Sequence, residues 1–216
     1  MHFISPNSPL GRWLGFLLDA LFVSVAWAIC CLPIVTLGAA TAALNRVAQN
    51  WMKDRSGCTL ADFFRAFREN FKGATLVWLI LLPPLAIILF NAYATWIALV
   101  GTTAAGKWLI LLSAVLWMAV AIYAFALQAT FENKPLTTVM NALRIALSHL
   151  PTTLILVALF GLSVGATLLL PYGAFAYAPF CVFLAARPVW NVFKKVMAMP
   201  EVTVVDREEE LENEGE

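Results

Sequence analysis

Long stretches without Asp, Glu, Lys or Arg divide the chain into apolar blocks. These stretches are residues 20–45, 73–106, 108–131 and 145–186. A helix needs about 20 apolar residues to cross the roughly 30 Å core of a bilayer, so each of the first three can hold one span. The fourth can hold two, and Pro171-Tyr172-Gly173 divides it. The pattern predicts about five spans, at residues 13–38, 74–100, 108–131, 152–170 and 174–193.

Three segments between the spans carry apolar residues at helical spacing, with polar residues opposite. The apolar stripes are Leu44, Val47, Ala48, Trp51 and Met52 in residues 39–55; Leu60, Phe63, Phe64, Phe67 and Phe71; and Leu136, Val139, Met140, Leu143 and Leu147 in residues 135–150. This spacing is typical of amphipathic helices. Such helices either lie in the headgroup layer on the cytoplasmic side or pack against the bundle.

Composition supports a helical membrane protein. Hydrophobic residues make up 62% of the chain and charged residues 12%, whereas soluble domains have about twice that share of charge. The apolar runs are continuous rather than alternating, which favours helices over a β-barrel. We therefore expect an all-α integral membrane bundle that forms a single domain over residues 1–196. Residues 197–216 are rich in Asp and Glu, and this composition predicts a disordered cytoplasmic tail.

Prolines and a weak internal echo add detail to this arrangement. Pro83-Pro84 interrupts the second span, so we expect a kink whose freed carbonyls need partners. The segment from Thr59 through Arg68 to Leu76 resembles the segment from Pro135 through Arg144 to Leu154. Two explanations remain open, an internal two-helix repeat and two helices that meet similar membrane constraints.

Basic residues are distributed unequally between the two sides of the predicted bundle. One side receives only Arg12 and Lys107. Short cytoplasmic loops carry an excess of Lys and Arg, so the N-terminus is predicted outside and the C-terminus in the cytoplasm. Trp78 is expected to anchor at the inner interface, and Trp117 to pack inside its span. The loop after the first span supplies a candidate cytoplasmic docking surface, formed by Arg46, Lys53, Arg55, Arg65, Arg68 and Lys72.

Few polar residues fall inside the spans. Asp19 is the one acid there, and a charge at the bilayer centre would cost about 2.5–3.5 kcal/mol. It either faces the bundle interior or an outer vestibule, or reaches the outer headgroups. Asn91 and Gln128 are lone amides that can bridge helices. Together, Asp19, Asn91 and Gln128 form a candidate polar intramembrane site.

Catalytic and cofactor motifs are absent from the sequence. There is no Walker loop, nucleophile elbow, HExxH or dinucleotide fingerprint. The four cysteines show no metal-ligand spacing, so we expect no metal and no cofactor. His149 suits a capping or interfacial role. The net charge of +1 implies no nucleic-acid partner. We therefore expect a protein that is not an enzyme.

The segment from Cys31 to Leu44, CLPIVTLGAATAAL, resembles the signature of the YesL-like family of bacterial integral membrane proteins. Three further segments fit in order: residues 62–71, residues 131–143 and Phe193-Lys194-Lys195. The resemblance covers most of residues 10–196. It implies a multi-pass protein of the bacterial plasma membrane, often encoded near sugar ABC transporters. It carries no catalytic residues, because the family has none established.

Three functions are compatible with these features. The first is an accessory or assembly component for carbohydrate uptake, with the lipid bilayer and carbohydrate ABC transporter components as partners. The second is a small-solute transporter or channel. The third is a membrane sensor or scaffold that signals through its cytoplasmic helices. The shortage of polar residues in the spans favours the first over the second.

Overall fold

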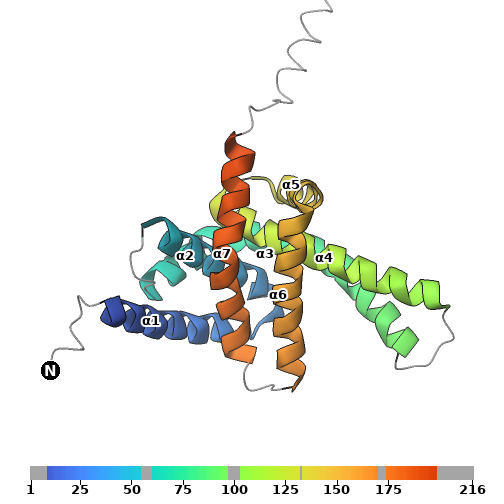
Figure 1. Cartoon of the computed structure of the whole chain (residues 1–216), viewed down its shortest axis with the longest axis horizontal. Coiled ribbons are helices and arrows are strands. Elements are labelled where there is room, and N and C mark those ends of the chain that lie inside the picture. Colours follow the sequence, from blue (N-terminus) through green and yellow to red (C-terminus); the bar gives the residue numbers. More distant parts are fainter. Residues whose placement is uncertain (1–8, 55–59, 97–102, 132, 170–173, 199–216) are drawn as a thin grey trace, which may run out of the picture.

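The computed structural model describes residues 9–54, 60–96, 103–131, 133–169 and 174–198, and every element in these ranges is helical. The predicted all-α class is therefore confirmed (Figure 1). The elements are α1 (Pro9–Cys30), the short 3-10 helix η1 (Ile34–Thr36), α2 (Leu37–Asp54), α3 (Leu60–Trp96), α4 (Ala104–Thr130), α5 (Pro135–Ser148), α6 (Leu150–Leu169) and α7 (Ala174–Ala198).

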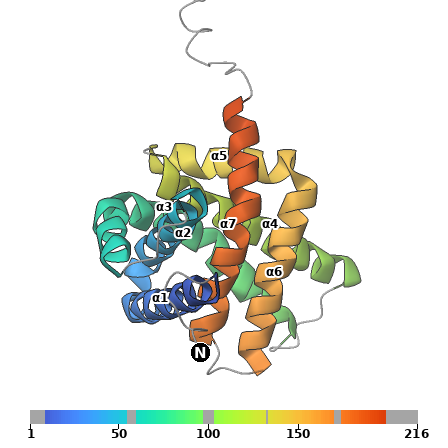
Figure 2. The ribbon, with the colours of Figure 1, turned by 60° about the vertical axis from the view of Figure 1, so that its left-hand side comes forward.

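The helices do not share one axis. In both ribbon views α6 and α7 run side by side. Helix α1 lies beside the lower part of α7, and α5 lies at the upper end of α6 (Figures 1 and 2). One apolar core, which includes Tyr123, joins α3 and α4 to α5, α6 and α7. A second core, which includes Phe63, joins α1 and α2 to the start of α3 and to α7. The C-terminal part of α3 and the N-terminal part of α4 extend away from both cores (Figure 1).

Among the described residues, two helices are long and apolar enough to cross a membrane. They are α3 over Leu60–Thr95 and α4 over Ala104–Thr130. The bent pair of α5 and α6 meets at 106° and would make a third span if counted as one. The apolar part of α1, Leu18–Cys30, is shorter. These findings fit a membrane protein, and the count of five spans stays a prediction.

The first span ends earlier than predicted, at Cys30 rather than at residue 38. Proline disfavours helix in the residue before it, so Pro33 stops α1 and starts a tight turn. The hydroxyl of Thr36 closes this turn by donating to the carbonyls of Cys30 at 2.6 Å and Pro33 at 2.8 Å. Helix α2 then begins at Leu37, close to the predicted residue 39.

The predicted separation between an interfacial helix at Leu60–Phe71 and a span from residue 74 is wrong. Helix α3 is continuous from Leu60 to Trp96, through Gly73 and through Pro83-Pro84. The two prolines free the carbonyls of Leu79 and Ile80. In the same turn, the indole Nε1 of Trp117 donates to the Leu81 carbonyl at 2.9 Å. Contact with α4 therefore supports α3 where its own hydrogen bonds are interrupted.

The predicted apolar stripes have different outcomes. In α2, Leu44, Val47 and Ala48 are buried as expected. In α5 both ends of the predicted stripe are exposed, with Leu136 at 64% and Leu147 at 54%, whereas Val139 and Leu143 pack against the first core. The buried face of α5 consists of Thr138, Ala142, Ile145 and Ala146. Small side chains let helices approach closely in membrane proteins, which leaves the larger apolar residues on the outer surface.

The first part of α3 packs against the bundle. Phe63 is fully buried and stacks with Phe67, whereas Phe64 and Phe71 are exposed. The internal repeat is not confirmed, because this segment continues straight into a span and its counterpart α5 is bent by 106° from α6. Most of the acidic tail, residues 199–216, lies outside the described residues.

Candidate functional site

The three residues of the predicted polar intramembrane site lie in different parts of the molecule. Asp19 is on α1, and Asn91 is exposed near the far end of α3, on the opposite side of the molecule (Figure 1). The Asn91 amide donates to Ile87 of its own helix at 2.8 Å. Gln128 is buried near the end of α4. The structure therefore does not bring the three side chains together.

Gln128 nevertheless bridges three helices, as its amide chemistry suggests. Its Oε1 accepts a hydrogen bond of 3.3 Å from the Thr138 hydroxyl of α5. Its amide nitrogen lies against Gly73 of α3, so closely that a Cβ at residue 73 would collide with it. Glycine at this position therefore lets α3 approach the buried amide. The helix continues through Gly73 without interruption.

Arg46 departs most clearly from the predicted docking surface. It is partly buried, and its Nη1 donates to the Ala129 carbonyl at 2.5 Å. The last carbonyls of a helix lack intrahelical donors and carry partial negative charge, so this guanidinium stabilises the end of α4. Arg65, Arg68 and Lys72 are exposed on α3. The side chain of Lys53 and all of Arg55 lie outside the described residues.

A second contact at the end of α4 was not predicted from the sequence. The amide nitrogen of Gln49, on α2, donates to the Ala126 carbonyl at 3.3 Å. The Thr130 hydroxyl donates to Gln49 Oε1 at 2.5 Å and to Ala126 at 2.8 Å. Gln49 is only 2% exposed. A buried amide signals that a partner exists, but only the packing of α2 on α4 identifies it.

Beside these contacts lies a polar cavity of about 410 Å³, where α4 ends and α5 begins. Its walls come from α2, α3, α4 and the segment before α5. The lining residues are Arg46, Glu69, Asn70, Gly73, Gln128, Thr130, Phe131, Asn133 and Lys134. Its described lining residues thus combine two cations, one acid and several neutral polar groups, a set suited to a small charged or polar ligand.

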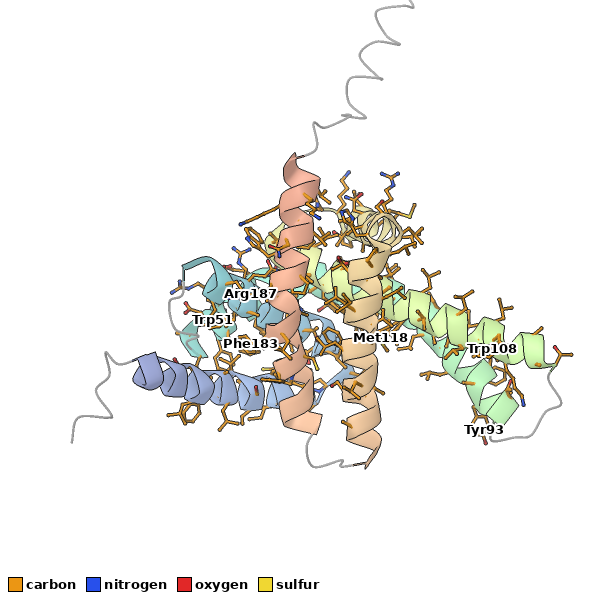
Figure 3. The ribbon with its side chains drawn as sticks, in the orientation of Figure 1. Trp51, Tyr93, Trp108, Met118, Phe183 and Arg187 are labelled. Carbon is orange, nitrogen blue, oxygen red and sulfur yellow. The ribbon has the colours of Figure 1, made fainter. Side chains whose placement is uncertain are left out.

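A different cavity opens on the far parts of α3 and α4. Residues 82–95 and 104–118 form what we call the arm, and Thr95 is the only buried residue among its described side chains. Tyr93 and Trp108 mark its outer end (Figure 3). Between the two helices and α5 lies an apolar cleft of about 580 Å³, lined by residues that include Ile87, Leu109 and Leu143.

The signature segment Cys31–Leu44 has a packing role in this structure. The indole of Trp78, on α3, donates to the Ile34 carbonyl at 2.9 Å. A Cβ at Gly38 would lie 2.5 Å from the Ala74 carbonyl oxygen, so only glycine allows this contact. Trp78 is 6% exposed and is therefore a packing residue, not the interface anchor predicted. The segment joins α1, α2 and α3.

The described residues contain no group of three His, Cys, Asp or Glu side chains that could hold a metal ion. His149 ends α5, and its backbone N–H donates to Ile145 at 3.1 Å. Its carbonyl accepts from the backbone and hydroxyl of Thr153 at the start of α6. The predicted capping position of His149 is therefore seen at the bend between the two helices.

Residues 16–92 match the model of a family described as a protein of unknown function, DUF624. This stretch contains most of α1, all of η1 and α2, and α3 as far as Ala92. The match is consistent with the predicted YesL-like resemblance. No curated protein and no solved structure matches the chain.

Proposed function

We propose that this protein is a non-enzymatic component of the bacterial plasma membrane that supports carbohydrate uptake through contacts with other membrane proteins. The arm carries the proposal of protein contacts. Its two helices pack on each other along one side and leave large apolar side chains exposed, with Trp108 at 70% and Leu109 at 68%. The link to carbohydrate comes from the YesL-like resemblance alone, which is an association rather than a physical argument.

The shape of the arm is what suits a protein partner. Lipid tails are as apolar as leucine side chains, so exposure alone does not drive helices together in a membrane. Association in a membrane depends on close packing, which needs a surface with grooves into which a partner helix can fit. The cleft between α3 and α4 supplies such a surface, because Pro84 and Ser113 in its lining have small side chains that leave part of the cleft open. A transmembrane helix of a partner would pack there.

The topology belongs to the same proposal. Five spans would place the N-terminus outside and the C-terminus in the cytoplasm, with the polar cavity on the inner side and the tip of the arm on the outer side. The basic residues after the first span support this orientation.

A small-solute transporter is the second candidate, and the polar cavity favours it. Transporter sites are formed by polar groups at interrupted helices near the middle of the membrane. Here the cavity is at the end of α4, whereas the interrupted turn at Pro83-Pro84 lies in the apolar cleft. The two features of a transport site are therefore in different places, which supports the accessory role.

The deciding experiment separates transport by this protein alone from support of another transporter. The purified protein is reconstituted into liposomes, and uptake of labelled sugars is measured. In parallel, sugar uptake is measured in cells that lack the gene. The accessory role predicts no flux in liposomes and reduced uptake in the deletion strain, restored by the wild-type chain. Saturable flux by the protein alone would replace the accessory role with the transporter.

Variants of the arm test whether the cleft makes the contact. Leu109→Trp places a large ring in the cleft, and Leu112→Trp places the same ring on an equally exposed part of α4 outside the cleft lining. Uptake in cells should fall with Leu109→Trp and stay near wild type with Leu112→Trp, at equal amounts of protein in the membrane. Equal uptake with both variants would remove the cleft from the proposal.

A further inference from the structure

The described lining of the polar cavity carries more positive than negative charge. Arg46 and Lys134 are its two cations, and Glu69 is the only acid among its described residues. Within the described chain, neither cation forms an ion pair with Glu69. Among the described lining residues the cations therefore outnumber the acid by one, which favours an anionic occupant.

The donors on either side of the cavity also point to an anion. Arg46 uses Nη1 for the Ala129 carbonyl, and a guanidinium has five N–H donors, so others remain. Lys134 is exposed and is the N-cap residue of α5, where no side chain caps the first backbone N–H groups. Free N–H groups and the positive end of a helix dipole attract negative charge. Helix α5 therefore begins beside the two cations.

The cavity lies at the level where a membrane span ends. Thr130 is both the last residue of α4, a helix able to cross the membrane, and part of the cavity wall. Immediately afterwards α5 runs across the bundle, bent by 106° from α6 (Figure 2). The ends of spans face the headgroup layer, so the nearest abundant anions are lipid phosphates.

We propose that this cavity binds the phosphodiester headgroup of a membrane phospholipid. Arg46 and Lys134 donate charge-assisted hydrogen bonds to the phosphate oxygens. The amides of Asn70 and Asn133 contact the polar group beyond the phosphate, and Glu69 disfavours a second negative charge on it. The volume of about 410 Å³ is within the range of small-molecule sites. This inference is independent of the proposed role in carbohydrate uptake.

Binding of a short-chain phospholipid to the purified protein tests the assignment. Dihexanoyl phosphatidylglycerol is titrated into protein held in an uncharged detergent, and the dissociation constant is measured by isothermal titration calorimetry. Lys134→Gln removes a charge from the cavity, and Lys107→Gln removes one from the other end of α4. We expect about tenfold weaker binding with Lys134→Gln, because charge-assisted hydrogen bonds are strong, and no change with Lys107→Gln.

Glu69→Gln provides a test of sign. It removes the only acid among the described lining residues, so an anionic lipid should bind severalfold more tightly, whereas a cationic ligand would bind more weakly. Weaker lipid binding by Glu69→Gln, or equal losses for Lys134→Gln and Lys107→Gln, would overturn the proposal. Inorganic phosphate is titrated in a separate arm. Phosphate that binds as tightly as the lipid would identify a soluble anion and overturn the lipid assignment.

Discussion

The two halves of helix α4 differ in burial and in the size of their side chains. From Ala119 to Ala129 all residues but Ile122 are buried, and the buried set includes five alanines. From Ala104 to Met118 none of the described side chains is buried, and leucine and tryptophan prevail. Small residues allow several neighbouring helices to approach closely, whereas bulky residues are found in the half of α4 that has fewer neighbouring helices. One continuous helix can thus serve as core at one end and as free surface at the other.

The polar groups follow the same division. At its buried C-terminal end, α4 receives donors from Arg46 and Gln49, and Gln128 accepts a hydrogen bond from Thr138. In the arm, Asn91 and Ser113 turn back to carbonyls of their own helices. Polar contacts between helices therefore fix the core, whereas the arm depends on apolar packing and on the hydrogen bond from Trp117 to α3.

Chemical labelling would show on which side of the membrane each end of α4 lies, and this prediction has the largest expected effect. Thr103→Cys lies before α4 and Asn133→Cys after it, and both residues are exposed. In a background without the native cysteines, a reagent that cannot cross the membrane should label residue 103 in intact cells and residue 133 only after lysis. Labelling of residue 133 alone in intact cells would reverse the topology.

Loss of glycine at the junction of α2 and α3 should strongly destabilise the core. Gly38→Ala puts a Cβ 2.5 Å from a backbone oxygen, and such overpacking costs about 1–3 kcal/mol. The melting temperature in detergent should fall by several degrees. Gly161→Ala is the control, because nothing lies within 4 Å of its Cβ position. A similar melting temperature for both variants would show that the close contact is not essential.

Loss of a buried amide should affect the core more than loss of an exposed one affects the arm. Gln49→Leu removes the partner of Thr130 and a donor to Ala126, at a cost of about 1–3 kcal/mol. Asn91→Leu in the arm should change the free energy of unfolding by less than about 0.5 kcal/mol. Chemical unfolding in mixed detergent micelles measures both. Equal effects would contradict the division into bonded core and apolar arm.

The smallest effect is expected where the arm joins the core. Trp117→Phe removes the donor to the Leu81 carbonyl beside Pro83-Pro84, which should cost about 0.5–1.5 kcal/mol. Trp108→Phe alters a residue that is 70% exposed and should leave stability unchanged. Thermal unfolding of the two variants in one detergent compares them. Unchanged stability of Trp117→Phe would mean that α3 needs no support from α4 at its prolines.

The sequence by itself determined the helical class and the approximate positions of most helices, because long apolar runs and 3.6-residue periodicity are local properties of the chain. It also indicated that Gln128 bridges helices, since a lone amide in an apolar run needs partners. It failed where a separate span was predicted to begin at residue 74, because the end of a charged segment looks the same along the chain whether the helix stops there or continues.

Only the tertiary structure decided which groups meet. Arg46 was predicted on a cytoplasmic surface, yet it caps a helix 83 residues further along the chain. The buried face of α5 proved to be its small-residue face, because close packing against α4 outweighs the size of the apolar stripe. The polar cavity draws its lining from four segments of the chain. Such long-range pairings depend on how helices pack, which periodicity along a single helix does not encode.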